Sequence, residues 1–238
     1  MREIRDERRL NDYLDRFRLT DVFSEDMKRH LALYRFEPDD ALCRQGDEPE
    51  YVFLIVLGKV KVYTTSAEGR TLLINFTKPL GVIGEIECLK GWGCLNTVTA
   101  VTPTEAIGIH KRHLDLFREE VPFLQFLLDR VTGKFYAKSL SLSTHLLYPV
   151  EVRFASYLLS VSSEQGDGTA TRISLSNMKD IADLIGTSYR HLNRVIQSFV
   201  ASGLAERRQG TLVVMDREGL ASMAGGNIYE NGEGRDSL

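Results

Sequence analysis

The region between residues 51 and 110 contains a series of short stretches rich in strand-forming residues. The predicted strands are 51–57, 60–65, 71–76, 97–101 and 105–110. In the second strand Val60 and Val62 alternate with Lys59 and Lys61, which is the period of two of a half-buried strand. Glycines at positions 46, 58, 69 and 81 divide the region at intervals of eleven or twelve residues. Several short strands at this spacing predict a β-sandwich or barrel over about residues 35–110.

After Lys111 the apolar positions change to helical spacing. Leu114 and Phe117 predict a short helix, and a longer helix begins at Pro122, a residue that the first helical turn tolerates. An i, i+3/i+4 stripe then runs through Leu124, Leu128, Val131, Phe135, Lys138, Leu142 and His145. Its five apolar members are typical of a seam between two helices and predict dimerisation through residues 121–148. The alternative is that the stripe only covers the barrel.

Pro149 ends the long helix, and a second domain follows it. Val152, Ala155, Ser156 and Leu159 have helical spacing, so we place a hinge near residues 146–150. The polar, glycine-rich stretch 162–172 predicts a loop or hairpin tip. The last residues, 223–238, are rich in Gly, Asn and Glu and predict a mobile tail without a packed role.

Residues 174–199 have the pattern of a helix-turn-helix. Ser176 is the predicted cap of a first helix, Gly186 supplies the turn, and Thr187 or Ser188 caps the second helix. The predicted inner faces, both at helical spacing, are Met178, Ile181, Ala182 and Ile185 on the first helix and Leu192, Val195, Ile196 and Phe199 on the second.

The outer face of the second helix carries groups that can donate to base edges or phosphates. Residues 204–215 follow it and predict two strands around Gln209 and Gly210, as in a basic wing. Between 189 and 208 four arginines oppose Glu206, a local net charge of +3. The predicted DNA contacts are Thr187, Ser188, Tyr189, Arg190, His191, Arg194, Arg207 and Arg208. The alternative is an adaptor whose winged helix binds protein.

The basic patch is a local feature, because the chain as a whole has a slight excess of acidic residues. The 238 residues include 30 Lys and Arg and 33 Asp and Glu, a formal net charge of -3, so the chain as a whole does not attract polyanions. The first seventeen residues have no apolar core of a secretory signal, and the longest apolar run, 51–57, is far shorter than a membrane span. We expect a cytoplasmic protein with no membrane partner. Three cysteines make a disulfide framework unexpected.

These motifs together resemble the cyclic-AMP receptor protein/FNR superfamily of bacterial transcription regulators, over about residues 15–222. The carriers are 43–47 (CRQGD), 55–62 (IVLGKVKV), 83–86 (IGEI) and the helix-turn-helix. Within the superfamily, 83–87 and 188–192 are similar to the YeiL-like branch. The resemblance implies a homodimer that binds a pseudo-palindromic double-stranded DNA operator and, in activators, contacts RNA polymerase. It places base reading at Tyr189, Arg190, His191 and Arg194, of which Arg194 matches a position that is commonly Arg.

The predicted fold is therefore α+β with four parts. They are a β-roll (jelly-roll, cyclic-nucleotide-binding-like) domain with short flanking helices at 1–120, the dimerisation helix at 121–148, a winged helix-turn-helix domain at 149–222 and the tail at 223–238.

The resemblance also implies an effector pocket, for which we predict Gly84, Glu85, Cys94 and Leu95. In cyclic-nucleotide binders of the superfamily a Gly-Glu pair begins the phosphate-binding cassette and an Arg-Ser pair follows. Here the segment 91–96 reads GWGCLN, so the arginine for the cyclic phosphate is missing. A buried phosphate without it loses contacts of about 1.5–3 kcal/mol each, and we predict no tight cyclic-AMP binding. The effector is left open, and the β-roll is either a sensor or a residual scaffold.

An iron-sulfur cluster, another metal site and an enzymatic function have less support in the sequence than DNA binding. A cluster bound by four cysteines within one subunit cannot form from three. Cys88 and Cys94 are either small apolar residues, the interpretation we favour, or a redox pair or partial metal site. His110 and His113 have a metal-ligand spacing without a carboxylate partner, so no metal is predicted. A cupin-like enzyme needs clustered His and Glu in the barrel, yet His30, His145 and His191 lie outside it, so we predict no enzyme.

Overall fold

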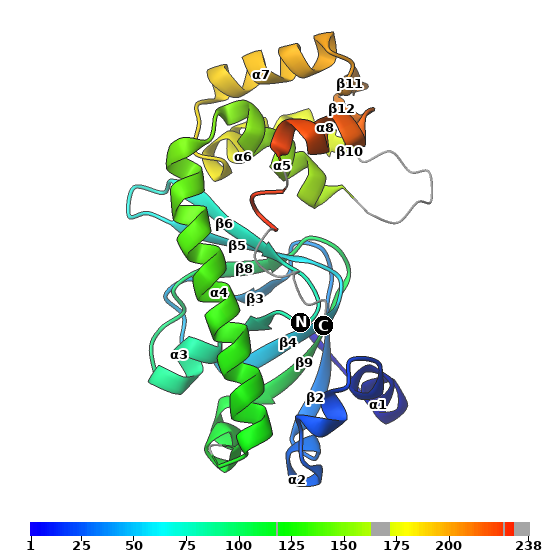
Figure 1. The fold of residues 1–238 in the computed structure, drawn as a ribbon, viewed down its shortest axis with the longest axis vertical. Coiled ribbons are helices and arrows are strands. Elements are labelled where there is room, and N and C mark those ends of the chain that lie inside the picture. The colour runs from blue at the N-terminus through cyan, green and yellow to red at the C-terminus, as the bar shows by residue number, and fades with distance from the viewer. Residues whose placement is uncertain (118, 163–171, 226, 231–238) are drawn as a thin grey trace. The chain divides into compact units, whose positions relative to one another are not determined.

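The computed structural model describes residues 1–117, 119–162, 172–225 and 227–230, with the side chains of 137–147 and 172 outside the description. The chain divides into two compact units (Figure 1). Unit 1 contains Met1–Thr64 and Phe76–Tyr136, and unit 2 contains Thr65–Asn75 and Ala137–Leu238. The predicted loop at 162–172 and the last eight residues of the predicted tail lie largely outside the described residues.

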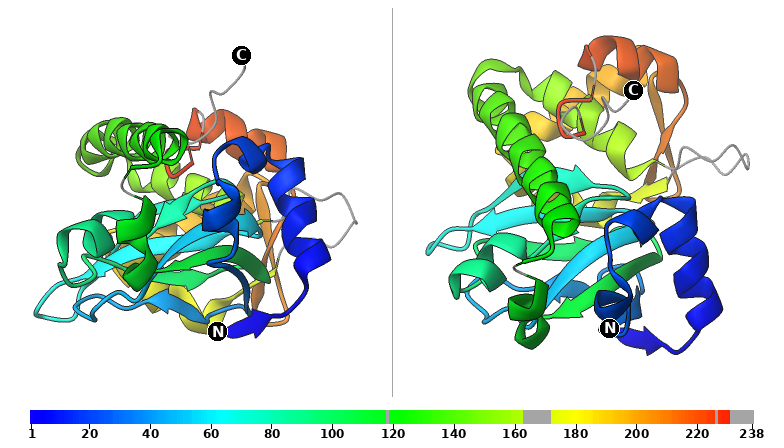
Figure 2. Two further views of the ribbon diagram at one scale, coloured as in Figure 1. Left: turned by 90° about the horizontal axis from the view of Figure 1, so that it is seen from below. Right: turned by 60° about the horizontal axis from the view of Figure 1, so that its bottom comes forward.

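The N-terminal β-roll is built from two sheets, which Figure 2 shows from two further directions. Its strands are β1 (Arg2–Ile4), β2 (Leu31–Phe36), β3 (Ala41–Cys43), β4 (Tyr51–Leu57), β5 (Val60–Thr65), β6 (Thr71–Thr77), β7 (Val82–Ile83), β8 (Thr97–Ala100) and β9 (Thr104–His110). One sheet has the order β1-β2-β9-β4-β7 and the other β3-β8-β5-β6. The five strands expected from the sequence are all present, within a residue at each end. The predicted barrel omits the start of β2, because the nearly continuous apolar run of this strand has no diagnostic period.

Short helices close one face of the first sheet. They are α1 (Glu7–Arg16), η1 (Leu19–Asp21), α2 (Glu25–Lys28) and η2 (Lys111–Phe117), together with the first turns of α4 (Val121–Leu147). The Phe123 ring of α4 lies 5.9 Å from that of Phe23 and 5.7 Å from that of Phe117, all three buried. Burying a side chain of this size contributes about 1.5–3 kcal/mol. The start of α4 is thereby held to the β-roll.

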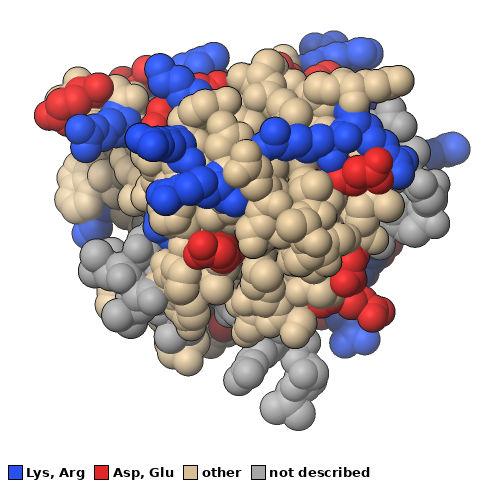
Figure 3. Space-filling model, turned by 90° about the horizontal axis from the view of Figure 1, so that it is seen from above, with Lys and Arg blue, Asp and Glu red and all other residues tan. Residues whose placement is uncertain are grey.

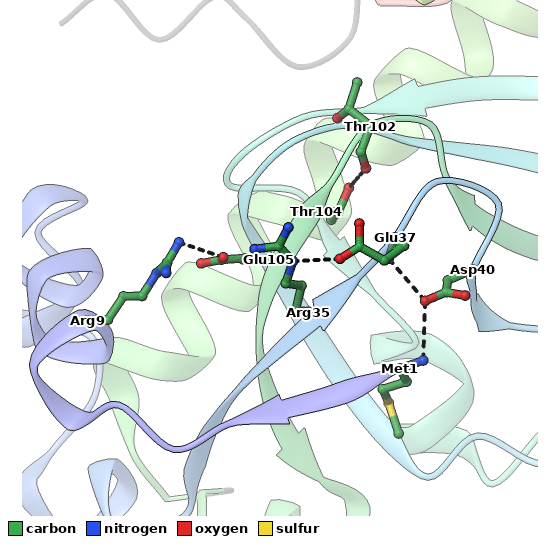
Figure 4. A network of polar contacts seen from close by, with 8 residues as sticks. All are labelled: Met1, Arg9, Arg35, Glu37, Asp40, Thr102, Thr104 and Glu105. Atoms are coloured by element: carbon green, nitrogen blue, oxygen red, sulfur yellow. Dashed lines mark hydrogen bonds and ion pairs between the residues drawn. The ribbon is translucent and has the colours of Figure 1, made fainter.

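A buried carboxylate anchors α1 to β9. Glu105 accepts a hydrogen bond from the Arg9 guanidinium at 2.6 Å (Figure 4) and one from the Tyr13 hydroxyl at 2.9 Å. Burial raises the pKa of Tyr13, so its hydroxyl remains a donor at neutral pH. Both carboxylate oxygens of Glu105 are therefore satisfied, as a buried charge requires.

Unit 2 contains a helical core and a small sheet. Its elements after α4 are α5 (Val150–Val161), β10 (Arg172–Ser174), η3 (Leu175–Asn177), α6 (Met178–Leu184), α7 (Tyr189–Ala201), β11 (Ala205–Arg208), β12 (Thr211–Val214) and α8 (Arg217–Ala224). The sheet order is β10-β12-β11, so the predicted two-stranded wing is present and gains a third strand. Phe154 of α5 and Phe199 of α7 are buried against one another with ring centroids 5.6 Å apart.

The start of the predicted mobile tail is packed, which corrects that prediction for the described residues 223–225 and 227–230. Ala224 ends α8 and is buried, and Tyr229 is buried as well. Asn227 donates from Nδ2 to Ser160 Oγ of α5 at 2.7 Å. The buried side chains of Tyr229 and Ala224 stabilise this segment, and a composition rich in Gly and Asn does not predict their burial.

Candidate nucleic-acid interface and effector cassette

Helices α6 and α7 form a helix-turn-helix around Gly186. Gly186 has φ +68, a left-handed conformation that favours glycine, and the next amide, Thr187 N, donates to Ala182 O at 2.9 Å. Ser188 caps α7, because its side chain accepts from His191 N at 3.2 Å. The predicted cap of the first helix is wrong. Ser176 lies inside η3, whose cap is Ser174, and α6 begins after this extra turn.

The inner faces of both helices are buried as expected from their spacing. The buried set comprises Met178, Ile181, Ala182, Ile185, Leu192, Val195, Ile196 and Phe199. Ala182 is fully buried, which agrees with a small residue where two helices cross. Since one face of α7 is committed to this core, its other face points to solvent.

That outer face of α7 carries the predicted contact residues. Tyr189 is 52% exposed, Arg190 and Arg194 are exposed, and His191 is partly exposed. Figure 3 views the molecule from the α7 end and shows a band of Lys and Arg side chains there, with fewer acidic ones between them. Arg190 and Arg194 are one turn apart and lie on the same side of the helix. The arrangement presents two guanidinium groups and a phenol from one helix surface.

The wing places its two arginines differently. Arg207 of β11 donates to Asn193 Oδ1 of α7 at 3.2 Å, so the wing is tied to the helix by a polar contact. Arg208 pairs with Glu206 at 2.6 Å, and this guanidinium lowers the pKa of the Glu206 carboxyl. Part of the charge of Arg208 is therefore compensated, whereas Arg207 adds its charge beside α7.

The cassette of unit 1 begins with a glycine in the left-handed conformation. Gly84 follows β7 with φ +84, and a Cβ there would lie 2.7 Å from Tyr51 O, so only glycine fits without displacement. The short helix α3 (Glu85–Lys90) starts immediately after it. Gly91 ends α3, also in the left-handed region, and the loop 91–96 leads to β8.

Glu85, the cassette carboxylate, is already paired within the chain. It is 2% exposed, and Lys134 of α4 donates from Nζ to its Oε1 at 2.7 Å. The same ammonium also donates to the carbonyl oxygen of Val82. Lys134 was not among the predicted site residues, and no local signal could have identified it because its partner lies 49 residues earlier.

A cavity of about 150 Å³ lies beside the cassette, and its walls include only part of the predicted effector set. Gly84 and Cys94 line it, together with Cys43. Glu85 does not line it, and Leu95 is exposed with its amide donating to Glu87 Oε1 at 3.3 Å. Of the four predicted residues, two therefore line the cavity and two do not.

The cysteines are placed differently from the combination weighed on sequence. Cys94 and Cys43 line the same cavity, whereas Cys88 does not line it. Burial raises the pKa of the Cys43 and Cys94 thiols, and it raises the pKa of Cys88 to about 12. All three are therefore protonated at neutral pH and are weak nucleophiles.

The histidines of unit 1 gather at the end of β9. The rings of His30 and His113 stack at 4.1 Å, His110 lies 6.3 Å from His113, and Arg112 Nε donates to His113 Nε2 at 2.9 Å. Among the residues that the structure describes, no group of three or more His, Cys, Asp or Glu is arranged to hold a metal ion.

Acidification is expected to destabilise unit 1 through His113. Burial, then His30, Arg112 and His110, lower the pKa of His113 below its ordinary 6.5. The unfolded chain therefore takes up the proton first, and stability is full above pH 6.5 and falls as the pH drops through and below that value. The urea midpoint should be measured between pH 8 and pH 5 by the fluorescence of Trp92, the one tryptophan. His113→Asn should flatten this dependence, whereas His191→Asn, in unit 2, should leave it; equal slopes in wild type and His113→Asn would contradict the prediction.

Two family models match the chain. The cyclic nucleotide-binding domain matches residues 33–120, and the Crp-like helix-turn-helix domain matches residues 152–223. Regulatory protein YeiL of Escherichia coli O157:H7 is 27% identical over 205 residues, which cover 86% of this chain and 90% of that protein. The CRP-like cAMP-activated global transcriptional regulator of Mycobacterium tuberculosis is 23% identical over 202 residues, covering 83% of this chain and 90% of that protein.

Solved structures share the fold. A transcriptional regulator of the crp/fnr family from Eubacterium rectale superposes with a TM-score of 0.72 at 15% identity, over 90% of this chain and 99% of that one. The c-di-GMP responsive global regulator CLP of Xanthomonas campestris gives a TM-score of 0.64 at 19% identity, over 87% of this chain and 99% of that one. No helix in the described part of this chain meets the length and hydropathy needed to cross a membrane.

Proposed function

This chain belongs to the CRP/FNR superfamily of transcription regulators, and from that premise we propose that it is a homodimer that binds a pseudo-palindromic DNA operator. The observation that carries the proposal is the exposed face of α7, where Arg190 and Arg194 lie on one side of a helix capped by Ser188. The superfamily is regulatory, and we assign no enzymatic activity to this chain.

Helix α7 has the features of a major-groove reader. Its N-terminal residues are exposed and include Tyr189, Arg190 and Arg194, and arginine is the residue that most often reads guanine by two hydrogen bonds. Arg207, held beside α7 by Asn193, has the position of a phosphate contact. We propose that Thr187, Ser188, His191 and Arg208 complete the interface.

The proposed dimer forms through α4. The helix presents Leu124, Leu128 and Phe135 to solvent, and the last two are 64% and 72% exposed. Phe123 and Leu127 of the same helix are buried against the β-roll, so α4 has one apolar face packed within the chain and a second one open. Val131 is partly exposed on this open face, and the side chain of Leu142 lies outside the described residues. Two copies paired along it would place two recognition helices about 34 Å apart, one turn of DNA.

Leu128→Glu is expected to raise the dimer dissociation constant by about 100-fold or more, because it places a carboxylate and its two-fold copy in an apolar seam. Sedimentation velocity over a concentration series measures this. Gln125→Glu, an equal charge at an exposed position of α4 off the stripe, should leave the dimer intact. A Leu128→Glu protein that remains dimeric at wild-type concentrations would remove α4 as the interface.

We propose that the β-roll does not respond to cyclic AMP. Its cassette lacks the arginine for the cyclic phosphate, and the Glu85 carboxylate is already paired with Lys134. Relatives differ in their ligand, since the mycobacterial one is cAMP-activated and the one from Xanthomonas is c-di-GMP responsive. Isothermal titration with cyclic AMP should show no binding in the micromolar range; a micromolar or tighter isotherm would contradict this. A cytoplasmic location and, for an activator, contact with RNA polymerase complete the proposal.

Selection from random duplexes with the full-length protein tests the proposed function. A homodimeric reader should enrich a two-fold symmetric site whose half-sites are one helical turn apart. The competing function is an adaptor whose winged helix binds protein, and such a protein would enrich no sequence.

A further inference from the structure

Arg153 of α5 holds the turn between the two helices of the helix-turn-helix. Its Nη1 donates to the carbonyl oxygen of Ile185 and, at 3.2 Å, to that of Gly186. Backbone amides serve the carbonyls before the turn, since Ile185 N donates to Ile181 O and Gly186 N donates to Asp183 O, both at 3.0 Å. The two carbonyls of the turn itself lie beyond the end of α6 and have no partner within that helix. One guanidinium nitrogen therefore serves both of them.

Gly186 leaves the space that this contact requires. A Cβ at position 186 would lie 3.1 Å from Nη1 of Arg153, which is closer than an ordinary van der Waals contact. The glycine thus adopts the left-handed conformation of the turn and also lets the guanidinium approach the backbone. Because Arg153 and Ile185 are 32 residues apart in the sequence, the contact is a tertiary one and not a local helix cap.

The same helix, α5, also contacts the far end of α7. Phe154, the residue after Arg153, is buried, and its ring lies 5.6 Å from the ring of Phe199. Phe199 is eleven residues beyond Ser188, the cap of α7, which corresponds to about 16 Å along the helix axis. Neighbouring residues of α5 therefore hold α7 at both of its ends. Two separated contacts fix the direction of a helix, whereas one contact would leave it free to tilt.

We propose that Arg153 is a positioning residue, which sets the angle at which α7 presents its exposed face to the bases. A side chain reads a base edge through hydrogen bonds of narrow length and direction, so a change in helix tilt weakens base reading. Binding to phosphates depends mainly on charge and tolerates such a change. Arg153 therefore contributes to the preference for the operator over other DNA. This role rests on the proposed function, since it exists only if α7 reads DNA.

Arg153→Met tests this role by fluorescence anisotropy on the selected operator and on a duplex of unrelated sequence, each over a salt series. The preference for the operator should fall by at least about 10-fold, within the range that the loss of one good base contact costs. Affinity for the unrelated duplex and its salt dependence should match wild type. An unchanged preference would overturn the proposal. So would a salt slope lower by about 0.9 per half-site, which would show that Arg153 itself contacts a phosphate.

Arg217→Met is the matched control, because it removes the same kind of side chain from another contact within unit 2. The Arg217 guanidinium of α8 donates to Ser162 Oγ and, at 3.5 Å, to the carbonyl oxygen of Leu159. Both partners lie at the end of α5, away from the turn, so this variant should lose stability but keep the operator preference of wild type. An equal loss of preference in Arg217→Met and Arg153→Met would show a general effect of destabilisation and would overturn the proposal.

Arg153→Lys provides a test that does not depend on the folding of Arg153→Met. Lysine keeps the charge and the apolar stem, but its ammonium ends nearer to the backbone than Nη1 does. Hydrogen exchange, measured by mass spectrometry on the full-length protein, should be faster than in wild type over residues 185–192 and unchanged over 150–161. Unchanged exchange over 185–192 would overturn the proposal.

Failure of this role and failure of the proposed function are distinguishable. A wild-type protein that selects no operator would refute the proposed function. A wild-type protein that selects an operator, with Arg153 variants that keep the full preference for it, would refute only the role of Arg153.

Discussion

Arg194→Ala is expected to weaken binding to the selected operator by about 1–3 kcal/mol per half-site and to relax the preference at one base pair. Arg194 is exposed on α7, one turn beyond Arg190, where a guanidinium can give two hydrogen bonds to guanine. Fluorescence anisotropy with the selected duplex, and with single-base variants of it, measures both effects. Unchanged affinity and unchanged base preference would show that α7 does not dock in the proposed way.

Arg207→Ala is the matched comparison for Arg194. It removes the same side chain from the wing, where Arg207 is bonded to Asn193 and faces the backbone in the proposed complex. We expect weaker binding to all sequences alike and a decrease of about 0.9 per half-site in the slope of log affinity against log salt, as for one lost phosphate contact in each half-site. A defect confined to particular bases would reassign Arg207 to base reading.

Lys134→Met is expected to destabilise unit 1 by about 3–5 kcal/mol, because it leaves the Glu85 carboxylate buried without its cation. The urea midpoint followed by Trp92 fluorescence reports on the same unit, since Trp92 lies in the loop after α3. Lys111→Met is the control. Lys111 also pairs with a glutamate, Glu48 at 2.7 Å, but that carboxylate is exposed, so little change is expected.

The double variant Lys134→Met/Glu85→Gln separates the ion pair from general packing. Removing both charges should restore most of the stability lost in Lys134→Met, because no uncompensated charge is left in the interior. A double variant as unstable as the single one would show that Lys134 acts through its packing. A single variant as stable as wild type would show that the ion pair does not form in solution.

The residues that sequence alone identified are those whose signal is periodic and local. Short runs of strand-forming residues located strands β4, β5, β6, β8 and β9, and helical spacing located both buried faces of the helix-turn-helix. The cap at Ser188 and the turn at Gly186 were also predictable, because each depends on the intrinsic preference of one residue. The cap of the first helix was not predictable, because Ser174 and Ser176 are equally good cap residues. In the structure Ser174 caps an extra turn, η3, that contains Ser176.

Sequence by itself determined the order of parts: a β-roll, a long helix and a winged helix-turn-helix with an arginine-rich outer face. Only the tertiary structure decided which distant side chains meet. It paired Lys134 with Glu85 and Arg207 with Asn193, brought Cys43 and Cys94 to the wall of one cavity, and packed Tyr229 where a mobile tail was expected. The physical reason is that periodicity records the face on which a residue lies, whereas a pair between separate elements depends on how those elements are registered and packed, which no local spacing contains.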